Sequence, residues 1–145
     1  MILVTDASVA VKWLVAEEGH EYAAQLLQAS PNLRAPDLIG SEVANVLWKK
    51  VRRQEMKVEQ GALALTSLPR FFEALVGSSA FLARAFQLAV ELDHPVYDCV
   101  YLACAESEGA KLATADARLA RKLAHTEHAS RILLVDRVIA PEELA

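Results

Sequence analysis

The chain has few cysteines and no long apolar run, and each shortage excludes a class of protein. Only Cys99 and Cys104 occur, and their spacing matches neither a zinc-binding pattern nor a disulfide framework. We expect two small core residues in a reducing compartment. No stretch approaches the roughly twenty apolar residues of a membrane-spanning helix, and the N-terminus enters a strand-like run without a basic leader. These features predict a soluble, cytoplasmic protein.

An excess of positive charge is absent as well. The formal net charge is −4, and 54% of the residues are hydrophobic. The acidic balance argues against a protein that grips nucleic acid through its overall charge, although a local basic strip is compatible with it. The apolar content is sufficient for a full core, and no repeat or low-complexity linker interrupts the chain. We therefore expect residues 1–145 to form one domain.

Short apolar runs alternate with longer helical patterns, which predicts a parallel sheet covered by helices on both faces. The predicted strands are residues 2–5, 33–35, 71–76, 111–114 and 132–135. The predicted helices run from Asp6 to Leu14, over 21–29, from Asp37 as N-cap to about 53, over 58–68, from 78 or 79 to 92, over 96–107, and onward from Asp116. A turn is expected at Ser30, Pro31 and Asn32.

Four acidic residues stand at or near the starts of predicted helices. Asp6 and Asp116 each follow directly after a predicted strand. In parallel sheets, ligand sites form beyond the carboxyl ends of the strands, near the point where the strand order reverses. Asp6 and Asp116 can therefore share one crevice although they lie near opposite ends of the chain. Glu42 and Asp98 stand on helices that could face the same crevice.

Each acid also has a purely structural explanation. Asp6 and Asp116 could serve only as helix N-caps, and Asp98 is favoured by the helix dipole in a first helical turn. Glu42 is harder to explain, because it falls inside a helical pattern beside apolar side chains, where an unpaired carboxylate is costly. An exposed edge of that helix is the alternative for Glu42.

Considered together, the four carboxylates indicate a metal site. Such a cluster repels itself unless a divalent cation occupies it. Mg²⁺ and Mn²⁺ prefer carboxylate oxygen and water as ligands. A bound metal can polarise a phosphate and lower the pKa of a bound water, so the set points to metal-dependent phosphodiester chemistry.

Four motifs around these acids resemble the PIN-domain ribonucleases, and most closely the VapC-type toxins of prokaryotic toxin–antitoxin pairs. The resemblance covers nearly the whole chain, with the motifs in the family's order. They are Val4-Thr5-Asp6-Ala7-Ser8, Pro36-Asp37-Leu38 followed by Glu42-Val43-Ala44-Asn45, Tyr97-Asp98-Cys99-Val100-Tyr101-Leu102-Ala103, and Leu112-Ala113-Thr114-Ala115-Asp116.

The resemblance implies a three-layer α/β/α fold with a parallel sheet of about five strands. It also implies Mg²⁺- or Mn²⁺-dependent endonucleolytic cleavage of RNA by the toxin of a type II pair, with a small antitoxin as partner and a homodimer as assembly. It assigns Asp6, Glu42, Asp98 and Asp116 to the catalytic site. Direct metal ligation falls to Asp6 and Asp98, while Glu42 and Asp116 act through water. It further implies supporting hydroxyls at Ser8 and Thr114, and an Asn45 that orients Glu42.

Basic and aromatic residues near the predicted site have two possible uses. Lys49, Lys50, Arg52, Arg53 and Lys57 form the densest basic run, and they could meet RNA phosphates or simply be a solvated helix end. Lys49, Arg52 and Arg53 are the candidate RNA-binding residues.

Trp13 and Trp48 fall on apolar helical faces, which favours core or interface packing over base stacking. The four histidines show no ligand spacing, and His125 and His128 are expected to be solvated in a polar loop.

Two competing functions stay open. A non-catalytic RNA-binding module could keep the fold without turnover, although a complete acidic set argues against it. A phosphatase or phospho-receiver on a similar sheet fits less well. Ser8 stands where a haloacid-dehalogenase-type phosphatase would have its second aspartate, and the spacing of the acids does not match a receiver.

Overall fold

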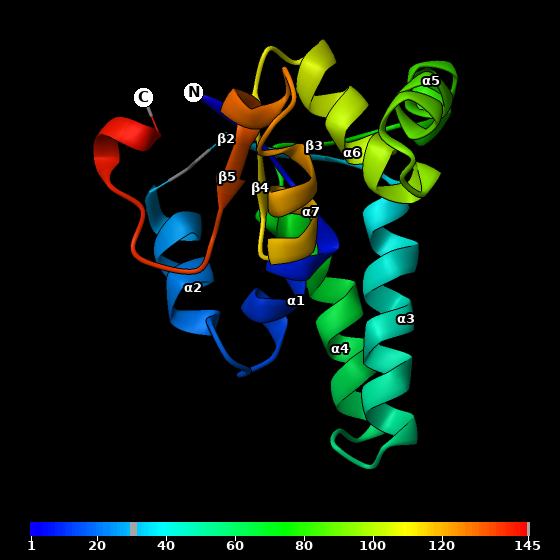
Figure 1. The fold of residues 1–145 in the computed structure, drawn as a ribbon. Helices are drawn as coiled ribbons and strands as arrows, with labels where there is room; N and C mark the ends of the chain where they lie inside the picture. The colour runs from blue at the N-terminus through cyan, green and yellow to red at the C-terminus, as the bar shows by residue number, and fades with distance from the viewer. Residues whose placement is uncertain (30–31, 145) are drawn as a thin grey trace.

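A parallel sheet forms the centre of the molecule, and helices cover both of its faces (Figure 1). The computed structural model describes residues 1–29 and 32–144. Within them the strands are β1 Ile2–Thr5, β2 Asn32–Pro36, β3 Ala74–Val76, β4 Lys111–Thr114 and β5 Ile132–Leu134. Their order is β3-β2-β1-β4-β5, and every neighbouring pair is parallel. The predicted three-layer fold is confirmed.

The helices lie between successive strands, as a parallel sheet requires. They are α1 Ala7–Leu14, α2 His20–Ala29, α3 Leu38–Arg52, α4 Val58–Ser67, α5 Leu82–Leu92, α6 Val96–Ser107 and α7 Ala117–Leu123. Adjacent residues of β1 point to opposite faces of the sheet, so Leu3 joins a core with α2, and Val4 joins a core with α3, α5 and α6. Among the described helices, none combines the length and the apolar content that a bilayer crossing requires.

The strand order reverses at β1. From β1 the chain moves outward through β2 to β3, and it then returns to place β4 on the other side of β1. Thr5 pairs with Ala113, and the pairing continues one step further, because the Asp6 N–H donates to the Ala113 carbonyl at 3.1 Å. The carboxyl ends of β1 and β4 therefore meet at the position where such sheets bind ligands.

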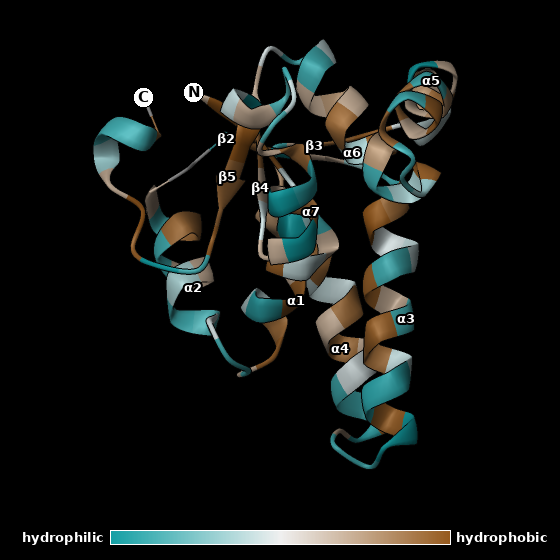
Figure 2. Cartoon of the chain, viewed as in Figure 1, coloured by the Kyte–Doolittle hydropathy of each residue, from teal (hydrophilic) through white to brown (hydrophobic). Residues whose placement is uncertain are grey.

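Helices α3 and α4 run side by side as a hairpin that extends away from the sheet (Figure 1). Figure 2 shows apolar and polar residues alternating along both helices, with hydrophilic residues at the far end where the two helices join. The residues that close this end, 52–55, are exposed. The hairpin thus ends in a polar, exposed tip, while large apolar side chains such as Trp48 and Leu63 are exposed along its helices.

The structure corrects the predicted strand at residues 71–76. Residues Leu68–Phe71 form a 3-10 turn, and β3 is limited to Ala74–Val76. Phe71 and Phe72 instead pack against Trp13, with ring centroids 5.4 and 5.7 Å apart. Aromatic residues read as strand formers because they suit a pleated surface, but here they fill the space beside α1.

The prediction for the start of α3 also needs correction. Asp37 occupies the N-cap position, yet its carboxylate makes no capping hydrogen bond. It accepts instead from the Ser78 N–H at 2.9 Å and from the Ser78 hydroxyl at 2.5 Å, and that hydroxyl accepts from the Leu38 N–H. Ser78 thereby caps α3 across the sheet edge, and Ser78–Phe81 forms a 3-10 turn before α5.

Smaller predictions had mixed outcomes. Cys99 and Cys104 are buried in α6, as expected. His128 is also buried, contrary to the expectation of a solvated loop, and its Nδ1 lies 3.5 Å from Glu106 Oε1. The turn predicted at Ser30 and Pro31 lies outside the described residues, and Asn32 belongs to β2.

Candidate functional site

Asp6 stands at the junction of β1 and α1, where it is 5% exposed. Its Oδ1 accepts from the N–H groups of Ser8 at 3.0 Å and Val9 at 3.4 Å, which caps α1. The Ser8 hydroxyl donates to the same oxygen at 2.5 Å. The capping role recognised in the sequence is therefore real, and it also fixes the carboxylate at the carboxyl end of the central strand.

Burial makes Asp6 a weak acid for its type. Loss of water contact raises the pKa of Asp6 to about 6 from its ordinary 3.8, against hydrogen bonds from Ser8, Thr114 and the Val9 N–H that lower it. The negative charge of Asp98 raises this pKa further. A carboxylate held in such surroundings is a site where a cation would be favoured.

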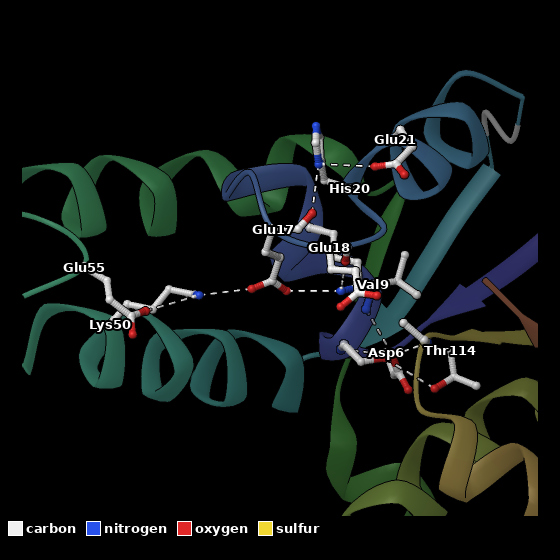
Figure 3. A network of polar contacts seen from close by, with 12 residues as sticks. Asp6, Val9, Glu17, Glu18, His20, Glu21, Lys50, Glu55 and Thr114 are labelled. Carbon is white, nitrogen blue, oxygen red and sulfur yellow. Dashed lines mark hydrogen bonds and ion pairs between the residues drawn. The ribbon is translucent and has the colours of Figure 1, made fainter. Parts of the chain in front are cut away.

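Two hydroxyls join Asp6 to Asp116. Ser8 Oγ lies 3.4 Å from Thr114 Oγ1 and accepts from the Ala115 N–H at 2.8 Å. Thr114 Oγ1 in turn accepts from the Asp116 N–H at 3.1 Å. Figure 3 shows Thr114 and Asp6 pointing toward each other across the β1–β4 junction. The carboxylate of Asp116 caps α7 through the Arg118 and Leu119 N–H groups, at 2.9 and 3.3 Å.

Glu42 is half-buried on α3 and is bound by a tyrosine from α6. The Tyr101 hydroxyl donates to Glu42 Oε2 at 2.6 Å, and Tyr101 itself is 1% exposed. Burial raises the pKa of Glu42, the hydrogen bond from Tyr101 lowers it, and the charge of Asp98 raises it. Tyr101 thus binds one carboxylate oxygen of Glu42, Oε2.

Asp98 lies in the first turn of α6 and has a partner one turn before it. Its Oδ2 lies 2.7 Å from Nε2 of His94, which precedes the helix. The Asp98 side chain keeps 35% exposure, whereas that of His94 keeps 17%. One carboxylate oxygen of Asp98 is therefore held by the histidine, and the carboxylate still reaches solvent.

Three of the acids share one electrostatic environment. Burial raises the pKa of the Tyr101 phenol far above its usual value, and the charges of Glu42, Asp6 and Asp98 raise it further. Asp98 also raises the pKa of both Asp6 and Glu42. Glu42 thus contacts Tyr101 directly, the charges of Asp6 and Asp98 act on the phenol through space, and Asp116 is linked to Asp6 through the Thr114 and Ser8 hydroxyls.

The donor chemistry of this cluster fits Mg²⁺ or Mn²⁺, but the cluster is not a closed cage. Carboxylate and hydroxyl oxygens are the ligands that such ions prefer. Within residues 1–29 and 32–144, however, no three Asp, Glu, His or Cys side chains converge closely enough to enclose an ion by themselves. Mg²⁺ usually keeps several waters and binds one or two carboxylates directly, which suits an open arrangement of this kind.

A groove of about 430 Å³ lies between α1 and α3, and Glu42 is the one of the four predicted acids that lines it. Its lining includes Ser8, Glu42 and Asn45, with Lys12 and Glu17 further along. Asn45 is exposed on this wall, and the hydrogen bond that holds Glu42 comes from Tyr101 instead.

Two of the lysines near this groove are neutralised by acids. Lys12 Nζ donates to Glu17 Oε1 at 3.3 Å, and Lys50 Nζ lies 3.0 Å from Glu17 Oε2 and 3.8 Å from Glu55. Figure 3 shows this row of ion pairs running from the end of α3 toward Asp6. Lys50, which belongs to the predicted basic run, is thus committed to structure.

Tyr101 and His94 are the site residues that the sequence reasoning did not single out. His94 stands four residues before Asp98, but it precedes α6 and is separated from it by Pro95, so helical spacing does not predict the contact. Tyr101 stands three residues after Asp98, but its partner Glu42 lies on another helix. That contact follows only from the packing of α3 against α6.

Comparisons with known proteins agree with this geometry. The sequence profile described as the PIN domain matches residues 3–124. The chain is 42% identical over 124 residues to "Ribonuclease VapC3" of Pyrobaculum aerophilum, which covers 84% of this chain and 95% of that protein. It is 30% identical to "Ribonuclease VapC9" of Mycobacterium tuberculosis, over 81% of this chain and 88% of the relative.

A solved structure gives the same result. The crystal structure of PAE2754 from Pyrobaculum aerophilum aligns with a TM-score of 0.66 at 25% identity, over 84% of this chain and 79% of that one.

Proposed function

The chain belongs to the PIN domain family, and on that premise we propose that it is a divalent-metal-dependent endoribonuclease, the toxin of a VapBC-type pair. The observation that carries the proposal is the buried Asp6 carboxylate at the carboxyl end of β1, where the strand order reverses, with Glu42 and Asp98 close enough for their charges to act on the same Tyr101. Neighbouring carboxylates that raise one another's pKa favour a cation and, through it, a phosphate.

The residues take different roles in this proposal. Asp6 and Asp98 bind Mg²⁺ or Mn²⁺ directly, while Glu42 and Asp116 act through water. When bound, the ion polarises a phosphate and lowers the pKa of a water. Glu42, held by Tyr101 through one oxygen, presents the other to orient a water for attack on the phosphorus atom. Ser8 and Thr114 hold Asp6 in place, and Asn45 lines the approach to Glu42.

The partners follow from the same relatives. A protein related to VapC ribonucleases is expected to act in the cytoplasm on RNA and to be silenced by a cognate small antitoxin. A cationic side chain from such a partner would suit the acidic cluster. We also propose a homodimer, because Leu82, Phe86 and Val90 leave an apolar stripe exposed on α5.

Replacement of Asp98 by Asn tests the proposal. We expect Asp98→Asn to lower RNA cleavage by purified protein in Mn²⁺ by about 100-fold or more, as loss of a charged group at a reacting centre does, and to abolish growth inhibition. Asp6→Asn should act in the same way. Glu59→Gln, which neutralises an exposed acid on α4, serves as the control and should cleave like the wild type. Full activity of Asp98→Asn with an intact fold would refute the proposed site.

A non-catalytic RNA-binding module is the second candidate. The absence of a closed three-ligand cage in the described residues is the observation that favours it. The same experiment separates the two, because such a module would bind RNA and leave it intact in Mn²⁺ at every protein concentration.

A further inference from the structure

The outer flank of α3 carries an aromatic side chain with no partner in the core. Trp48 is 53% exposed, in contrast to Trp13, which packs on Phe71 and Phe72 and donates its indole N–H to the Ala23 carbonyl at 2.8 Å. Of the core or interface packing expected of both tryptophans, core packing is confirmed for Trp13, whereas Trp48 lies outside the core. A large exposed aromatic ring on a helix is more typical of a binding surface than of a free face.

Three cations surround this ring. Lys49, Arg52 and Arg53 line, together with Trp48, a surface depression of about 360 Å³. The guanidinium of Arg52 lies over the indole, 5.5 Å from the ring centroid. Within the described residues none of the three cations forms an ion pair, although Lys50 beside them is paired with Glu17 and Glu55. In a chain of net charge −4, this is a local concentration of uncompensated positive charge.

The flank is continuous with the acidic groove. Asn45 lines the groove, and Trp48 and Arg52 stand three and seven residues after it, on the same side of the helix. Lys49 stands seven residues after Glu42 and continues the face that carries this acid. At 1.5 Å per residue, Trp48 lies about 9 Å beyond Glu42 along the helix axis. A strand bound at the acids and following α3 would therefore reach this surface next.

We infer that Trp48 and Arg52 form a stacking platform for an unpaired base of single-stranded RNA, with Lys49 and Arg53 holding the adjoining phosphates. An exposed indole with uncompensated Lys and Arg beside it is the combination that binds single strands without strong sequence preference. An acidic site needs such cations, because its own charge repels the phosphates of the substrate. This inference rests on the proposed function and assigns the RNA a path.

The test measures RNA binding apart from cleavage. Fluorescein-labelled single-stranded RNA oligonucleotides are titrated with Asp98→Asn protein, with and without a second substitution, in chelator so that no strand is cut. Trp48→Ala should weaken binding roughly tenfold, and Trp48→Phe should retain most of the affinity, because a phenyl ring still stacks. Arg70→Ala, which removes an exposed arginine in the 3-10 turn between α4 and β3, is the matched control and should bind like the parent.

A set of abasic oligonucleotides separates stacking from a structural role. Each oligonucleotide in the set lacks one base, at a different position. We expect one of these positions to weaken binding to the parent protein. Loss of the same base should not weaken binding to the Trp48→Ala protein any further. Lys49→Ala and Arg53→Ala should each lower the slope of log affinity against log salt by about 0.7.

The outcomes distinguish this inference from the proposed function. Trp48→Ala protein that binds RNA as the parent does, while the wild type cleaves RNA, overturns the platform and leaves the nuclease standing. Loss of inhibition by a co-expressed protein partner, with RNA binding unchanged, assigns the surface to that partner instead. A wild-type chain that binds no RNA refutes both.

Discussion

The Tyr101 hydroxyl group donates a hydrogen bond to Glu42, one of the site acids. Removing it by Tyr101→Phe leaves the buried ring in place but deprives Glu42 of its donor. Since burial raises the pKa of Glu42 and the tyrosine opposes that rise, the variant should hold Glu42 protonated to higher pH. We expect the rate of RNA cleavage at neutral pH to fall about tenfold. The acidic limb of the pH–rate profile should move to higher pH.

Tyr97→Phe is the matched control for this prediction. Tyr97 precedes Asp98 on the same helix but is 63% exposed. It should therefore keep the wild-type profile. A Tyr101→Phe protein with an unshifted acidic limb would show that the hydroxyl serves packing alone.

Asp6 makes stability depend on pH in the metal-free protein. Its pKa is about 6 in the folded chain and near 3.8 when exposed, so the folded state binds the proton more tightly than the unfolded state does. The contribution of Asp6 to the free energy of unfolding is therefore most favourable at low pH. This contribution is lost as the pH rises from about 4 to above 6. The loss is on the order of 3 kcal/mol at neutral pH.

Asp6→Asn isolates this contribution, because asparagine still caps a helix but does not titrate. In urea denaturation of chelator-treated protein, the variant should be more stable than the wild type at pH 7.5, and the difference should shrink toward pH 4.5. Adding Mn²⁺ at pH 7.5 should then raise the wild-type melting temperature and leave the variant nearly unchanged. A constant difference across pH would contradict the assignment.

The elements that bear the acids differ in how far the sequence predicts them. Asp6 and Asp116 are predictable because strand, cap and helix follow one another locally, and the structure confirms both caps. The hydrogen bond between Tyr101 and Glu42 cannot be predicted from local sequence, because it joins residues that are 59 positions apart. The prediction that His128 is solvated was wrong for a similar reason. Its neighbour Glu106 lies on α6, in another part of the chain.

The edge strand β3 shows most clearly how far local sequence can predict secondary structure. The segment at 71–76 has strand-like composition, yet only Ala74–Val76 pairs with β2. Its aromatic residues contact α1, a helix far earlier in the chain. Tertiary packing thus decides between strand and turn where local preference is equal.

For the whole molecule, the alternation of strands and helices predicts the parallel sheet, but the strand order does not follow from it. That order, with β1 between β2 and β4, is what brings Asp6 beside Thr114 and makes the crevice. The resemblance to the PIN-domain ribonucleases supplied the expectation that the acids meet. Physical reasoning on the residues alone placed two of them at one edge of the sheet.

The exposed face of α5 predicts how whole molecules associate. Leu82, Phe86 and Val90 recur every four residues and are 51%, 65% and 68% exposed, so they form one apolar stripe along the exposed side of α5. If two copies bury this stripe against each other, Phe86→Glu places charges in the interface and should convert a dimer to a monomer, as light scattering after gel filtration would show. Leu63→Glu, on an equally exposed position of α4, should remain dimeric. An unchanged mass for Phe86→Glu, or a monomeric wild type at micromolar concentration, would exclude α5 as the interface.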